Sequence, residues 1–142
     1  MTQDVQLLQA VYQNVQMGID GIKNIYDDAK EDAFRQELRR QEDEYRVLSD
    51  EASEKLYSMD EKPEEIGAMA KAGTFISTEF NTMADSTTSH LAEMMIQGTS
   101  MGITKLMRKI RSLDQVDVRT QKLAQKVVTT EEINVENLKK YL

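Results

Sequence analysis

The chain holds one histidine, His90, and Glu93 follows it by three residues. Side chains at this spacing share one face of a helix. An imidazole beside a carboxylate can bind a metal ion, carry a proton or accept a phosphoryl group. Because there is a single histidine and no cysteine, sites that need several histidines or a Cys–His pair are excluded. We favour a packed core or interface histidine, with a ligand role as the alternative.

Carboxylates and amides form the second set of candidates. Glu37, Gln41 and Glu44 lie at helical spacing, and Glu131 precedes Asn134 in a Glu-x-x-Asn pattern. If these side chains faced one another inside a helical bundle, they would need hydrogen-bond partners. We expect the three glutamates at the solvated edge of their helices. Gln41 and Asn134 fit the apolar stripe better and are candidates for packing or interface positions.

Helical periodicity runs along the whole chain, and no segment shows the alternation of a strand. Apolar residues recur at spacings of three and four, which predicts helices over residues 2–28, 31–59, 86–113 and 115–142, with a partly helical crossover over 60–85. Pro63 followed by two glutamates is typical of a helix start inside that crossover. The predicted stripe of the first helix comprises Val5, Leu8, Tyr12, Val15, Ile19, Ile22 and Tyr26.

The matched helix lengths favour one all-α domain over residues 1–142. Each helix of about 28 residues would be about 42 Å long, and a helical crossover of about 20 residues could span roughly the same length. Such a connector makes the second and third helices parallel and leaves two antiparallel hairpins. This is the connectivity of a ferritin-like four-helix bundle. The alternative is an irregular five-helix domain.

The stretch from Ser89 to Gly98, the triplet Met101-Gly102-Ile103 and the ending from Glu132 to Leu142 resemble bacterial proteins of the ferritin-like superfamily. The resemblance implies a Glu on each of two helices and a Glu-x-x-His on each of the other two, all holding two metal ions. This chain departs from that pattern: His90-x-x-Glu93 is reversed, and Asn134 stands where a second histidine would be required. We therefore expect no complete di-metal site and no cofactor.

Three further patterns come from the third helix and its approach. Gly98-x-x-x-Gly102 allows another backbone to approach closely, either within the bundle or across a dimer. The methionines gathered there predict core packing, with a hydrophobic ligand groove as the minority alternative. The basic residues lie near the C-terminus of this helix, where positive charge interacts favourably with the negative end of the helix dipole. The methionines are Met83, Met94, Met95, Met101 and Met107, and the basic residues are Lys105, Arg108, Lys109 and Arg111.

A formal net charge of -7 argues against a nucleic-acid partner, and no signal peptide or membrane-spanning run is visible, so we expect a cytoplasmic protein. The favoured function is a non-catalytic structural or interaction module that forms a homo-oligomer, in the simplest case a dimer. One alternative is a degenerate iron- or manganese-binding bundle that uses His90, Glu93, Glu37, Glu44 and Glu131. Another is a histidine phosphotransfer module that uses His90.

Overall fold

The computed structural model describes residues 2–65 and 86–142. Within these residues the chain forms four helices and no strand: α1 (Gln3–Tyr26), α2 (Asp32–Ser58), α5 (Thr88–Ser112) and α6 (Val118–Lys139). The all-α class is confirmed, and each predicted helix end lies within three residues of the observed one. Most of the predicted crossover, from residue 66 to residue 85, lies outside the described residues. None of the described helices is long and apolar enough to cross a membrane.

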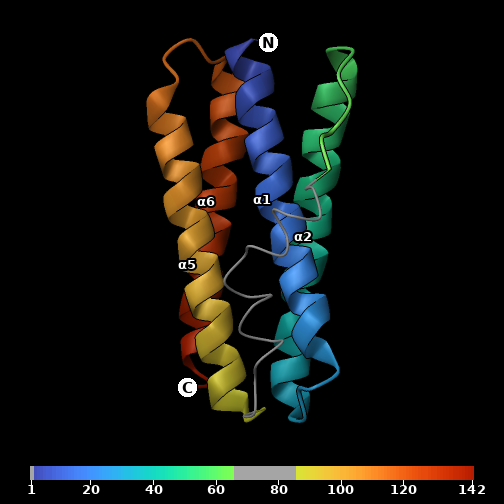
Figure 1. Ribbon diagram of the computed structural model, residues 1–142, viewed down its shortest axis with the longest axis vertical. Helices are drawn as coiled ribbons and strands as arrows, with labels where there is room; N and C mark the ends of the chain where they lie inside the picture. The colour runs from blue at the N-terminus through green and yellow to red at the C-terminus, as the bar shows by residue number, and fades with distance from the viewer. Residues whose placement is uncertain (1, 66–85) are drawn as a thin grey trace.

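The four helices pack side by side along one long axis (Figure 1). Helix α1 packs on α2, α5 packs on α6, and the two pairs meet through α1 with α5 and through α2 with α6. In Figure 1, α1 and α6 run downward, whereas α2 and α5 run upward. Each of these neighbouring pairs is therefore antiparallel, and α2 and α5 are parallel to each other. The two chain ends lie at opposite ends of the bundle.

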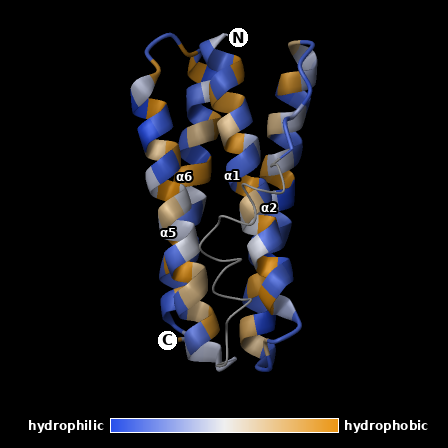
Figure 2. Ribbon diagram, viewed as in Figure 1, coloured by the Kyte–Doolittle hydropathy of each residue, from blue (hydrophilic) through white to orange (hydrophobic). Residues whose placement is uncertain are grey.

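The core lies along the inward stripes of the helices, as the hydropathy colouring in Figure 2 shows. In the first helix the predicted stripe is confirmed from Val5 to Ile22, while Tyr26 is only partly buried. Met59, which follows the last turn of α2, is 40% exposed and does not belong to the core. Burial of these apolar side chains is the main force that holds the four helices together. Near one end, the rings of Phe34 and Tyr141 pack with their centroids 5.2 Å apart.

Residues 61–65 come after α2 in the chain, have no regular secondary structure and lie alongside α1. The side chain of Gln9 holds them: its Nε2 donates to the Lys62 carbonyl (2.8 Å), and its Oε1 accepts from the Glu64 amide (2.8 Å). Tyr12 donates a further hydrogen bond to the Glu65 carboxylate (3.0 Å). The expected helix start at Pro63 is therefore wrong for the residues up to Glu65, since side chains of α1 bind this backbone in a non-helical form.

We expect Gln9→Ala to release residues 61–65 from α1, because it removes both hydrogen bonds to their backbone. The loss of stability should be about 1–2 kcal/mol. Hydrogen exchange should show faster exchange of the Glu64 amide, and Gln13→Ala, one turn further along the same helix, is the matched control. An unchanged exchange rate of the Glu64 amide in Gln9→Ala would contradict the role of Gln9 in holding residues 61–65 against α1.

Candidate functional site

Polar side chains interrupt the apolar core near the midpoints of the four helices. They are Asn14 of α1, Tyr45 of α2, Thr99 of α5 and Glu131 of α6, and we call them the central polar layer. Tyr45, Thr99 and Glu131 are almost completely shielded from solvent, with Glu131 only 2% exposed. The expectation that Glu131 is solvated is therefore wrong: its position on the α6 stripe points inward.

Within the central polar layer, the Tyr45 hydroxyl donates to Glu131 Oε2 (3.1 Å), and Asn14 Nδ2 donates to the Gly102 carbonyl (3.0 Å). Two glycines make room for these groups. A Cβ on Gly18 would lie 2.7 Å from the Tyr45 ring, and one on Gly102 would lie 3.3 Å from Asn14 Nδ2 and 3.6 Å from Glu131 Oε2. The close approach at Gly102 is therefore made within the bundle.

Burial raises the pKa of Glu131 to about 8, against the opposing effect of hydrogen bonds from Tyr45 and Asn14. The pKa of Tyr45 is also raised well above its usual value, first by burial and then by the neighbouring Glu131. At neutral pH the Glu131 carboxyl is therefore mostly protonated. A carboxyl in this state is a hydrogen-bonding group and must lose its proton before it can serve as an ionised metal ligand.

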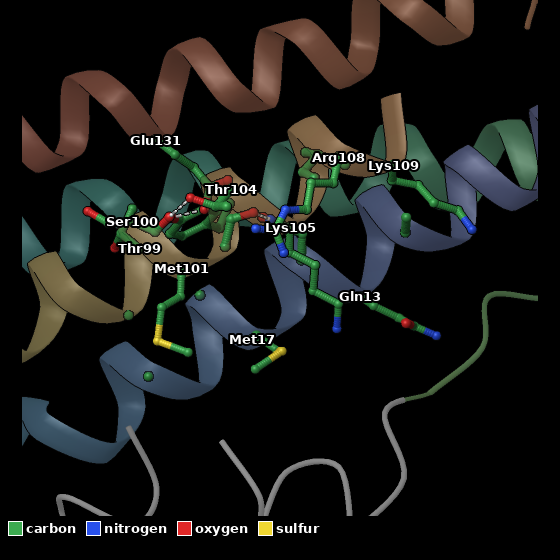
Figure 3. A pocket seen from close by; sticks show the side chains of 18 of the residues that line it. Gln13, Met17, Thr99, Ser100, Met101, Thr104, Lys105, Arg108, Lys109 and Glu131 are labelled. Carbon is green, nitrogen blue, oxygen red and sulfur yellow. Dashed lines mark hydrogen bonds between the residues drawn. The ribbon is translucent and has the colours of Figure 1, made fainter. Parts of the chain in front are cut away.

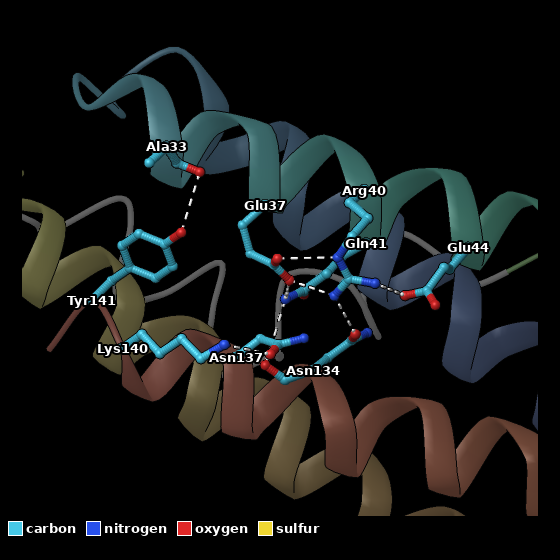
Figure 4. A network of polar contacts seen from close by, with 9 residues as sticks. All are labelled: Ala33, Glu37, Arg40, Gln41, Glu44, Asn134, Asn137, Lys140 and Tyr141. Carbon is cyan, nitrogen blue, oxygen red and sulfur yellow. Dashed lines mark hydrogen bonds and ion pairs between the residues drawn. The ribbon is translucent and has the colours of Figure 1, made fainter.

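A second polar cluster joins α2 to α6 (Figure 4). We call it the Arg40 network, and its members are Glu37, Arg40, Gln41, Glu44 and Asn134. The Arg40 guanidinium forms a bidentate pair with Glu37, donates to Glu44 Oε1 (2.8 Å) and donates to Asn134 Oδ1 (3.2 Å). Gln41 Nε2 adds a hydrogen bond to Glu37 Oε2 (2.7 Å). The single Arg40 guanidinium is thus paired with both Glu37 and Glu44, the two carboxylates of α2 that were candidate metal ligands.

The Arg40 network contains two of the amides singled out from sequence. Gln41 and Asn134 are fully buried, which agrees with their expected positions on the stripes. Burial alone would raise the pKa of Glu37, but hydrogen bonds from Arg40 and Gln41 outweigh it and hold that pKa below its usual value. Glu37 is therefore an ionised group already paired with a protein cation, whereas the Glu44 side chain remains 41% exposed.

His90 and Glu93 lie apart from both clusters, in the first turns of α5. His90 is partly buried, Glu93 is exposed, and the His90 backbone amide donates to the capping hydroxyl of Thr87 (3.2 Å). Among the described residues, no three His, Cys, Asp or Glu side chains come together in a group that could hold a metal ion. The donor set predicted for a degenerate metal site, His90, Glu93, Glu37, Glu44 and Glu131, therefore does not fit a di-metal centre.

A groove with a volume of about 1200 Å³ runs between α1 and α5 beside the central polar layer (Figure 3). Met17, Met95 and Met101 contribute apolar surface, and Gly98 and Gly102 leave the α5 wall without side chains. Towards one end of the groove lie Lys105, Arg108 and Lys109, which we call the basic trio. Asn14, Tyr45 and Glu131 line its floor.

The predicted core packing of the methionines is only partly confirmed. Met94 and Met95 are buried, whereas Met101 is 56% exposed and Met107 is 36% exposed, and Met83 lies outside the described residues. The error arises because α5 contacts neighbours on a narrower stripe than its apolar sequence suggests.

Comparison of the chain with protein-family models, with curated proteins and with solved structures found no match.

Sequence analysis missed two members of this site, Asn14 and Gly18. A usable signal was present, because Ala10, Asn14 and Gly18 follow one another at intervals of four and present small or polar groups on one face of α1. Glu131 was expected at the solvated edge of its helix, and its pairing with Tyr45 could not be seen without the packing of α2 against α6.

The stability of the bundle should fall as the pH rises from 5.5 to 8.5. The folded chain keeps a proton on Glu131 up to about pH 8, whereas an ordinary glutamate loses it near 4.5. Within this interval the folded state binds more protons, so each pH unit costs up to about 1.4 kcal/mol. We expect Glu131→Gln to abolish this loss in chemical unfolding, while Glu132→Gln, at the exposed neighbouring position, keeps it. If the free energy of unfolding changed equally with pH in the wild type and in Glu131→Gln, this result would contradict a protonated Glu131 carboxyl in the folded state.

Proposed function

We propose that this chain is a ferritin-like four-helix bundle that works as a structural or interaction module and has no metal-based catalysis. The helix directions support this architecture. Two antiparallel hairpins with parallel second and third helices are the arrangement expected when a long crossover joins them. The sequence resemblance points to the same superfamily.

The observation that carries the proposal is the Arg40 guanidinium between Glu37 and Glu44. In a di-metal bundle, carboxylates of this kind are neutralised by metal cations. Here a guanidinium fixed in the same chain supplies the positive charge, and it also binds Asn134 of α6. A metal ion would have to displace Arg40, and the guanidinium would lose its hydrogen bonds to Glu37, Glu44 and Asn134.

Glu131 supports the same conclusion from the centre of the bundle. Binding of a divalent cation there would require removal of the proton that burial keeps on the carboxyl. Within the described residues its hydrogen-bonding partners are the Tyr45 hydroxyl and the Asn14 amide. The layer thus supplies one carboxyl where a di-metal site requires several.

We expect the purified protein to take up no stoichiometric iron or manganese. The protein would be incubated with Fe²⁺ or Mn²⁺, dialysed, and analysed for metal by mass spectrometry. Aerobic oxidation of Fe²⁺ should proceed at the rate of buffer alone. Stoichiometric metal that is lost in His90→Ala or in Glu131→Gln would overturn the proposal in favour of a degenerate metal-binding bundle.

The partner that we propose for the module is a second copy of the chain. Large apolar side chains are exposed on three helices, and an oligomer would cover part of that surface. They include Val47, Tyr57, Met101, Met107, Val118 and Ile133. Light scattering should then give a mass of twice the monomer, and a strictly monomeric mass at high concentration would contradict self-association.

A further inference from the structure

We infer that the groove between α1 and α5 binds a small amphipathic anion, with the apolar body along the methionines and the acidic group at the basic trio. This inference goes beyond the proposed structural role and does not depend on the ferritin-like relationship. It rests on three separate features of the groove: its apolar wall, its unpaired cations, and the polar atoms without partners at its floor.

The apolar wall is wide because glycines replace side chains. Gly18 and Gly21 of α1 and Gly98 and Gly102 of α5 all line the groove. Met17 and Met101 lie at its open side, as Figure 3 shows. Methionine side chains are flexible and polarisable, so they adapt to ligands of varied shape. A volume of about 1200 Å³ is large enough for a lipid-sized molecule.

The basic trio sets the sign of the ligand's charge. Lys105 and Arg108 are exposed and Lys109 is partly buried. Within residues 2–65 and 86–142, none of the three forms an ion pair, although the chain as a whole is acidic. Three cations at spacings of three and four residues at one end of an apolar groove complement a carboxylate or phosphate.

Among the described residues, buried polar atoms without hydrogen-bond partners line the groove, and they are a separate indication of a ligand. Glu131 Oε1 and Asn14 Oδ1 are buried atoms with no hydrogen-bond partner in the described part of the chain. Both residues line the groove, and Glu131 is 2% exposed. Buried polar atoms of this kind require a partner. An amide or hydroxyl in the ligand, held one helical turn from the basic trio, can donate to Asn14 and accept from the protonated Glu131.

N-dodecanoylglycine is a suitable probe because its amide lies close to its carboxylate. The protein would be labelled with ¹³C at the methionine methyl groups and titrated below the aggregation concentration of the probe. We expect saturable shifts of the Met17, Met95 and Met101 methyl signals. Met59 and Met107, which do not line the groove, should stay in place.

Charge and amide are tested separately. Lys105→Glu with Arg108→Glu should weaken binding about tenfold or more, whereas Lys122→Glu, at an exposed position of α6, should not. Tetradecanoate, which lacks the amide, should bind about tenfold more weakly than N-dodecanoylglycine. Dodecyltrimethylammonium should also bind more weakly, and this comparison requires no variant.

Four results of these titrations would overturn the inference. They are the absence of methyl shifts, shifts that are equal at Met59 and Met107, binding that resists charge reversal, and equal binding of the cationic probe. Nuclear Overhauser contacts from residues 66–85 to Met17 or Met101 in the ligand-free protein would also overturn it, because the chain itself would then fill the groove. Binding to anionic vesicles without an effect of the monomeric probe would indicate a membrane surface instead.

Discussion

The hydrogen bond between the Tyr45 hydroxyl and the Glu131 carboxyl is the constraint around which the middle of this bundle is organised. An ionised carboxylate cannot be buried among apolar helices without a compensating charge, so the carboxyl keeps its proton and acts as a neutral polar group. The aromatic ring that carries the hydroxyl must then cross from α2 to α6. Gly18 is required on α1 because any side chain there would collide with that ring.

The chain uses two different solutions for carboxylates inside one bundle. Glu131 is neutralised by a proton, whereas Glu37 is neutralised by Arg40. The difference follows from solvent access, because the Arg40 side chain is 40% exposed and can hold its charge in contact with water while its guanidinium reaches inward. At Glu131 no cation is within hydrogen-bond reach among the described residues. Both solutions leave the carboxyl groups unsuited to a metal, and they do so for independent reasons.

Most of the fold could be predicted from the sequence, whereas only part of the site could. Regular spacing of apolar residues determines which face of each helix is buried, and this was enough to place Gln41 and Asn134 on inward stripes. Spacing cannot decide whether a polar residue on a stripe is solvated, because a small rotation of the helix moves its side chain between core and edge. The buried Glu131 carboxyl accepts a hydrogen bond from Tyr45 of α2, and a Cβ on Gly102 of α5 would lie 3.6 Å from it. That information resides in the packing of α5 against α6.

The glycines that leave room for the central polar layer also line the groove beside it. A side chain at Gly18 or Gly102 would press on Tyr45 or Asn14, so both positions must remain without one. Without side chains of their own, these glycines add no apolar surface to the walls of the groove that they line. Larger residues in the groove would bury more apolar surface and stabilise an ordinary bundle. The bundle therefore retains an incompletely filled surface as the cost of its buried polar centre, and sites of this kind trade stability for the capacity to bind.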